Sequence, residues 1–398
     1  MLAGWTVGDV VRCRESVDGR PATLVHLAPL TSVAGALRAL AAGNVLSAPV
    51  VGDEGGVADV GRGVYHGFCD VRLLLGSFLG QLVEAEPELA RPDIPVLKRM
   101  RLLEDAGPKL MHRTVAEVLG DLRRVLGVRA AGGDGTFRAF VCDLACPLDR
   151  LLEEGFLADC PRWLAAHRVA VGDPGTGRIA DVVSQTDVLR FLRARWADLP
   201  FRGAEFAVAD LGLDLSGAVT TVSVEDPVLL SYLHLAREGQ AAAAVVDPSD
   251  GTLVANLSAS DLRGLRPEHC GELALNTLEY LATKDHKPPR EPRTDRDELM
   301  GGGPAASPTP HLHAHGATPR SGEHTTKVKS LDFGEVEIDA EAISCGESTL
   351  VRDVVDKLLQ RKVHRVYVVD EGGVPRGVVT MTDIIASIHK ACIAKATA

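Results

Sequence analysis

The chain has 398 residues, of which 45% are hydrophobic and only 4% aromatic, and its 43 basic and 54 acidic residues give a net charge of −11. A single hydrophobic core rarely grows to this length, so we expect at least two domains. The acidic balance, uninterrupted by a basic run, disfavours general binding to nucleic acid or to an anionic membrane.

No apolar stretch approaches the roughly 20 residues that a membrane-spanning helix needs, and the N-terminal segment carries acidic residues where a signal peptide would be apolar. We therefore expect a soluble protein of the cytoplasm, the nucleus or both. The cysteines are scattered, and the spacing of Cys142 and Cys146 matches no common zinc motif, so we expect reduced thiols.

One pattern recurs along the chain: an amphipathic helix, two short strands, and a polar corner at which a second helix begins. In the first copy a helical pattern covers residues 33–43, and the strands lead to Asp70. In the second copy the helical pattern covers 148–166, and the strands run from His167 towards Asp187.

The third copy has a helical pattern over residues 228–238 and strands within 241–258, followed by Asp261. The fourth has a helical pattern over 350–360 and the segment "HRVYVVDEGGVPRGVVTMTD", which ends at Asp383. The pattern is thus present in four copies in the same order. It predicts an α+β protein built from four β-α-β-β-α repeats.

The segments between the copies predict the domain organisation. Residues 1–200 should form a first pair, with repeats at about 20–80 and 138–197, and residues 201–284 a third repeat that pairs with the fourth at 328–398. Residues 285–327 are rich in proline, glycine and histidine and should form a flexible linker. Its "HLHAH" tract, with His311, His313 and His315, is more typical of incidental composition than of a metal site.

The polar corner of the fourth copy has the chemistry of a nucleotide site. The first turn of a helix offers unpaired amides and a positive dipole end to phosphate, and Thr380 and Thr382 could add hydroxyl contacts. Asp383 could accept hydrogen bonds from a ribose diol. His364 and Arg365, ahead of the first strand, could bind phosphate oxygens.

Apolar strand residues could cover an adenine face, and the candidates are Val366, Val368 and Val378. The plain alternative is that hydroxyl and carboxylate only cap the helix. Recurrence of a basic pair one strand upstream favours the nucleotide site, because capping does not require it.

The other copies keep this set to different degrees. The second copy retains all of its kinds of residue, namely Ser184, Asp187, His167 and Arg168. The third copy retains Ser258, Ser260 and Asp261, with Gly239 and Gln240 where a basic residue is expected. The first copy retains Asp70, with Gly67 at the hydroxyl position and Leu46 at the phosphate contact. We expect occupancy to fall in the order four, two, three, one, with fewer than four sites filled.

These segments carry a family resemblance. The fourth copy resembles a cystathionine-β-synthase-type (CBS) domain, and four such copies resemble the gamma, energy-sensing subunit of AMP-activated and sucrose-non-fermenting-related kinases. The stretch "LSASDLRGLRPEHCGELALNTLEYL" is most similar to the plant gamma-like branch. The resemblance implies two CBS pairs (Bateman modules) in a disc. It also implies adenine nucleotides in central clefts, with the carboxylate on ribose and the hydroxyl and basic residues on phosphate.

By that resemblance the chain is a non-catalytic regulatory subunit of a kinase complex. Its ligands would be AMP, ADP or ATP, with no cofactor, and its partners a catalytic α subunit and a scaffolding β subunit. The alternative is a CBS scaffold that binds no nucleotide and acts as a protein-interaction module. An enzyme is disfavoured, because the sequence holds no P-loop, G-x-S-x-G, H-E-x-x-H or kinase motif set.

Overall fold

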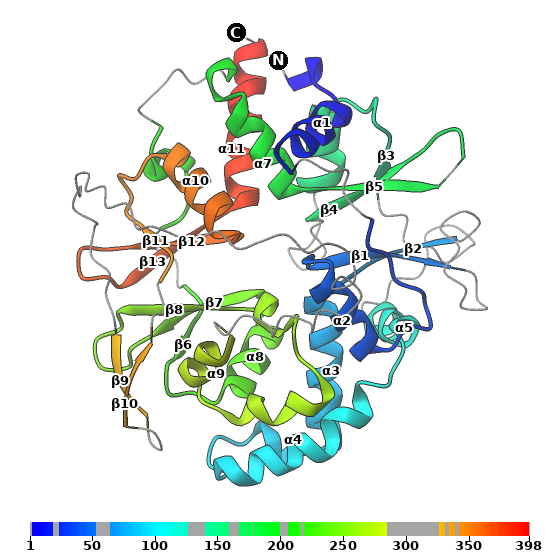
Figure 1. The fold of residues 1–398 in the computed structure, drawn as a ribbon. Coiled ribbons are helices and arrows are strands. Elements are labelled where there is room, and N and C mark those ends of the chain that lie inside the picture. The colour runs from blue at the N-terminus through cyan, green and yellow to red at the C-terminus, as the bar shows by residue number, and fades with distance from the viewer. Residues whose placement is uncertain are drawn as a thin grey trace, which may run out of the picture.

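The computed structural model describes residues 2–18, 24–52, 64–125, 140–158, 167–176, 178–199, 206–215, 219–284, 326–330, 334–338 and 342–397. Each repeat has an antiparallel strand pair at its centre (Figure 1). The pairs are β1 (Ser47–Gly52) with β2 (Val64–Asp70), β4 (Arg168–Gly172) with β5 (Ile179–Ser184), β7 (Ala242–Val246) with β8 (Leu253–Ser258), and β12 (Arg365–Val369) with β13 (Pro375–Thr380).

A helix crosses over each sheet before its strand pair. In repeats two, three and four it follows a short strand that is parallel to the first strand of the pair, namely β3 (Val141–Cys142), β6 (Thr221–Ser223) and β11 (Ser344–Cys345). Parallel neighbours need such a crossover. The helices are α2 (Val33–Ala42), α6 (Leu148–Arg150) continued by the π-helical turn η3 (Leu151–Phe156), α8 (Val228–Arg237) and α10 (Val351–Arg361). The first helical stretch of the segment expected over 148–166 ends at Phe156, and residues 159–166 lie outside the described residues.

A second helical element begins where each strand pair ends. These elements are α3 (Val71–Ala85), α7 (Gln185–Ala194), the 3-10 turn η6 (Ala259–Leu262) and α11 (Met381–Thr397). In α11 the residues at helical spacing, Ile384, Ile385 and Ile388, are fully buried, as their periodicity predicts. Repeat three differs because η6 is a single turn, followed by η7 (Pro267–Ala274) and α9 (Thr277–Lys284).

The remaining elements surround the repeats. They are α1 (Val7–Asp18), α4 (Val96–Leu110), α5 (Val115–Val125), the short turns η1 (Leu2–Gly4), η2 (Pro87–Ala90), η4 (Trp196–Asp198) and η5 (Val208–Leu211), and the hairpin of β9 (Thr326–Ser330) with β10 (Gly334–Ile338). The predicted linker lies outside the described residues up to position 325, and its last two positions begin β9. None of the described helices could span a membrane.

Two hydrophobic cores hold the repeats together. One combines residues of repeats one and three, such as Leu74 and Tyr232, and the other combines residues of repeats two and four, such as Leu189 and Ile385. Figure 1 shows the corresponding helices above and below the sheets, with α7, α10 and α11 on one side and α2, α3 and α8 on the other.

The sheets of consecutive repeats also touch. Between repeats one and two, Arg168 Nη1 donates to Ser47 Oγ at 3.0 Å. Between repeats three and four, the Leu253 amide donates to the Gly373 carbonyl at 3.0 Å. Every repeat therefore contacts one neighbour through its sheet and another through its helices. The division into pairs at residues 200 and 328 stays a prediction.

Candidate functional site

The four corners have the same backbone geometry, which shows which residues are equivalent. In each repeat the first amide of the helical element donates to the carbonyl of the residue before the first long strand. The four bonds are Val71 to Leu46 (3.0 Å), Gln185 to His167 (3.1 Å), Ala259 to Ala241 (2.9 Å) and Met381 to His364 (3.2 Å). His167 and His364, each followed by an arginine, thus occupy the same place at the start of a strand.

In repeats two and four the predicted hydroxyl and carboxylate lie together. Asp187 Oδ2 accepts from the Ser184 amide at 2.8 Å and from its Oγ at 2.6 Å. Asp383 Oδ2 accepts from the Thr380 amide at 2.8 Å and from its Oγ1 at 2.6 Å. One carboxylate oxygen in each repeat therefore takes part in a capping box. Only Oδ1 remains for another role, so capping and ligand binding are compatible.

Repeat three forms the same corner without a basic strand start. The amide of Ser258 donates to Asp261 Oδ2 at 2.7 Å, and the hydroxyls of Ser258 and Ser260 are 2.7 Å apart. The equivalent of the His-Arg pair is Ala241 with Ala242, because Ala242 is opposite Ser258 in the strand register. The expectation that Gly239 and Gln240 stand there is wrong, since both lie before Ala241 in the chain.

Repeat one has a different register from the one predicted. Asp70 is opposite Ser47 and is itself the N-cap, accepting from the Leu73 amide at 2.7 Å. It occupies the hydroxyl position, and Leu73 stands where the other repeats have a carboxylate. Gly67 lies inside β2, opposite Val50, rather than at the hydroxyl position. The leucine periodicity after Asp70 was a signal for this helix start. That Asp70 contributes to ligand binding stays a prediction.

The predicted adenine cover is partly wrong as well. Val366 and Val368 are fully buried in the core of repeats two and four, so neither can contact a ligand. Successive strand residues point to opposite faces, and these two point towards the helices. Val378 lies on the neighbouring strand opposite Tyr367 and is partly exposed.

The basic strand starts lie in a crowded electrostatic environment. Burial, with the charge of Arg72 next, lowers the pKa of His167 to about 4. Burial, with the charges of Arg168 and Arg365 next, lowers the pKa of His364 to about 4. Both imidazoles are therefore neutral near pH 7.

Two arginines at this centre were not predicted. Arg72 Nη2 on α3 donates to Asp70 Oδ2 at 3.0 Å, and after burial the Arg72 charge contributes to the lowered pKa of Arg365. Arg263, after η6, similarly contributes to the lowered pKa of Arg168. Neither position is basic in the other repeats, so the repeat pattern held no signal for them. All four repeats therefore bring cationic side chains towards one centre.

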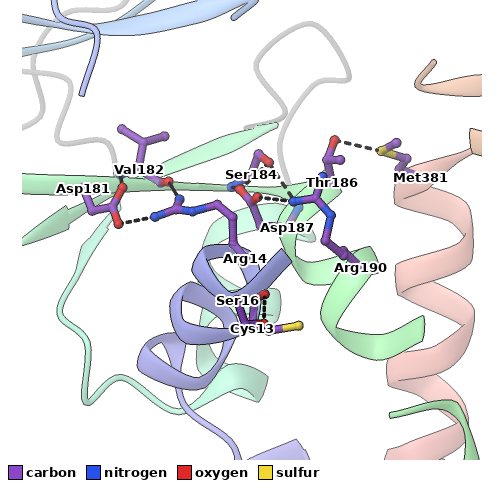
Figure 2. A network of polar contacts seen from close by, with 10 residues as sticks. All are labelled: Cys13, Arg14, Ser16, Asp181, Val182, Ser184, Thr186, Asp187, Arg190 and Met381. Carbon is purple, nitrogen blue, oxygen red and sulfur yellow. Dashed lines mark hydrogen bonds and ion pairs between the residues drawn. The ribbon is translucent and has the colours of Figure 1, made fainter. Parts of the chain in front are cut away.

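The corners of repeats two and four are bonded to each other. Gln185 Nε2 donates to Thr382 Oγ1 at 3.0 Å, and Gln185 Oε1 lies 3.3 Å from His167 Nδ1. Thr186 Oγ1 donates to Met381 Sδ at 3.5 Å, as Figure 2 shows. The helix starts of α7 and α11 therefore face one another, so a ligand at either corner would lie beside both.

Figure 2 also shows the surroundings of Asp187. Arg14 on α1 donates to the Val182 carbonyl at 2.9 Å and to Asp181 Oδ2 at 2.5 Å, which ties α1 to β5. Arg190, one turn along α7, places Nη1 3.5 Å from Asp187 Oδ1. Among the residues that the structure describes, no three histidine, cysteine or acidic side chains gather as ligands for a metal ion.

Comparison with known proteins agrees with this architecture. The model of the CBS domain family matches residues 334–390. A curated relative, the SNF1-related protein kinase regulatory subunit gamma-like PV42a of Arabidopsis thaliana, is 42% identical over 51 residues. That match spans 13% of this chain and 14% of the relative's length.

Two solved structures extend the comparison. Protein MJ1225 of Methanocaldococcus jannaschii, described provisionally as an archaeal homologue of g-AMPK, has a TM-score of 0.54 at 12% identity, over 92% of this chain and 96% of that one. An uncharacterized conserved protein of Pyrococcus horikoshii has a TM-score of 0.36 at 13% identity, over 63% and 79%. At 12% identity, the similarity to MJ1225 shows the fold alone, and it extends over all four repeats. The chain thus contains a CBS domain at residues 334–390, and its overall fold is similar to that of the archaeal protein.

Proposed function

We propose that the chain is a non-catalytic regulatory subunit of an SNF1-related or AMP-activated-type protein kinase complex, which senses energy state by binding AMP, ADP or ATP. The observation that carries the proposal is the convergence of the His-Arg strand starts with the hydroxyl and carboxylate corners of repeats two and four. A nucleotide combines the anion and the diol that these groups would bind.

Repeat four offers the most complete set. Its helix start and Thr382 would bind phosphate together with His364 and Arg365, while Oδ1 of Asp383 would accept from the ribose. Repeat two has the same kinds of residue. Repeat three lacks the cationic strand start and repeat one lacks the carboxylate, so we place them below the other two.

The kinase partnership rests on different support. The curated relative is named a kinase regulatory subunit, and its similarity to this chain is confined to a short segment. A catalytic α subunit and a scaffolding β subunit are the partners we propose. The corner aspartates are engaged in helix caps, which suits binding rather than catalysis.

The proposal is tested by calorimetric titration of the full chain with AMP, ADP and ATP. We expect micromolar binding that Asp383→Ala weakens roughly tenfold or more, because hydrogen bonds to a charged group are lost. Asp383→Asn serves as a second variant, since its amide oxygen can still accept the capping bonds. Asp353→Ala, which removes a carboxylate 54% exposed on α10, is the matched control and should leave affinity unchanged. Absence of heat with the folded wild-type protein contradicts nucleotide binding.

A scaffold without a nucleotide is the second candidate. It is favoured by the self-contained capping boxes and by Leu46 and Ala241 at strand starts where repeats two and four have histidine. Co-purification separates the two candidates. If kinase subunits are retained equally by wild type and by the Asp187→Asn/Asp383→Asn double variant, and no nucleotide binds, the scaffold account holds.

A further inference from the structure

The two most complete corners differ at their carboxylates. Both Asp187 and Asp383 use Oδ2 for capping, so a ribose diol would have to be bound through Oδ1. In repeat two Oδ1 lies 3.5 Å from Arg190 Nη1. In repeat four the position equivalent to Arg190, three residues after the aspartate, is Ala386.

The Asp187 ion pair is shielded from solvent. The side chain of Asp187 is 11% exposed and that of Arg190 is 28% exposed, so water screens the pair less than it would a surface pair. Arg190 extends along α7 to Asp187, and Arg14 reaches Asp181 within β5 from α1 (Figure 2). A diol hydroxyl that donates to Oδ1 would compete with this guanidinium for the same lone pairs.

We propose that Arg190 is a specificity-determining residue that occupies the ribose-binding oxygen of Asp187 and makes repeat two the weaker nucleotide site. The proposal rests on the proposed function, because it assigns Asp187 and Asp383 to ribose. Alanine at position 386 leaves repeat four without this competitor. One chain would thus hold two sites of similar residues and unequal affinity.

The test isolates repeat two in the full chain by removing the ribose contact of repeat four. In an Asp383→Asn background, AMP and adenosine are titrated with and without Arg190→Ala. We expect Arg190→Ala to tighten binding of both ligands about fivefold, the effect of removing one partly screened competing ion pair. Arg195→Ala is the matched control, since this arginine is 56% exposed and pairs with Asp198 instead. Arg190→Met keeps the aliphatic stem if the alanine variant folds poorly.

Each outcome decides between the accounts. Unchanged affinity after Arg190→Ala, with AMP still bound, overturns the role of Arg190 and leaves nucleotide binding intact. Weaker AMP binding also overturns it, because Arg190 would then attract the phosphate. Tightening for AMP but not for adenosine overturns it as well, because competition for a ribose contact would affect both ligands. Tightening that further substitution of Asp187→Asn abolishes supports it. If neither ligand binds wild type or any variant, the proposed function fails and this inference with it.

Discussion

At the scale of single residues, the two strand-start histidines have the most distinctive chemistry. The pKa values of His167 and His364 are both lowered to about 4, first by burial and then by neighbouring arginines. A neutral imidazole can still donate a hydrogen bond to phosphate. Because both histidines are neutral, they add no charge repulsion to that between the neighbouring arginines.

These histidines make stability depend on pH. In the unfolded chain they titrate near pH 6.5 and in the folded chain near 4, so below pH 6.5 the unfolded state binds more protons. Their contribution to the free energy of unfolding is complete above pH 6.5 and is lost as pH falls towards 4.

We expect urea denaturation to show a lower free energy of unfolding at pH 5 than at pH 7, and a smaller difference between the two pH values in the His167→Gln/His364→Gln variant. The exposed His234→Gln is the control; an equal pH effect in all three proteins contradicts this account.

At the scale of elements, the close packing of α4 on η7 joins a segment between repeats one and two to repeat three. A Cβ atom on Gly107 would lie 2.6 Å from Cys270 Sγ, closer than side chains tolerate. Because Cys270 is fully buried, it has little room to move.

Gly107→Ala should therefore lower the free energy of unfolding by about 1 to 3 kcal/mol through overpacking, despite the better helix propensity of alanine. Gly76→Ala in α3, where an added Cβ meets no atom within 4 Å, is the matched control. It should be neutral or stabilise by up to about 1 kcal/mol. Chemical denaturation measures both, and equal effects of the two substitutions would refute the close contact.

Some of the strands, helix starts and registers could be predicted from the sequence, and others could not. The strand pairs and capping corners of repeats two, three and four follow from local periodicity and turn residues, so the sequence predicted them. The register of repeat one was missed because Asp70 resembles the motif aspartate in sequence and serves as the N-cap in space. Arg72 and Arg263 could not be predicted, because only the folded chain brings α3 and η6 to the same centre.

At the scale of the whole molecule, each hydrophobic core is shared by repeats that are not consecutive. The core of repeats two and four includes Val188 and Leu192 together with Ile384 and Ile388, from helices far apart in sequence. Patterns within one repeat show which helix face is apolar and not which partner covers it. The sequence therefore could not predict this arrangement.

The shared cores predict how fragments behave. A fragment of residues 1–200 would expose the apolar faces that repeats three and four cover. We expect it to bind a hydrophobic dye and to unfold at lower urea concentration than the full chain, because buried apolar area is lost. A fragment that unfolds cooperatively at the midpoint of the full chain, without dye binding, contradicts the importance of the shared cores.

The central claim is that repeats two and four present a nucleotide site at the centre of the molecule. Crystallising the full chain with AMP and determining the electron density tests it most directly. We predict a nucleotide whose phosphate contacts His364 and Arg365 and whose ribose contacts Asp383. Density for AMP away from these residues, or a centre filled by side chains alone at saturating AMP, would contradict the account.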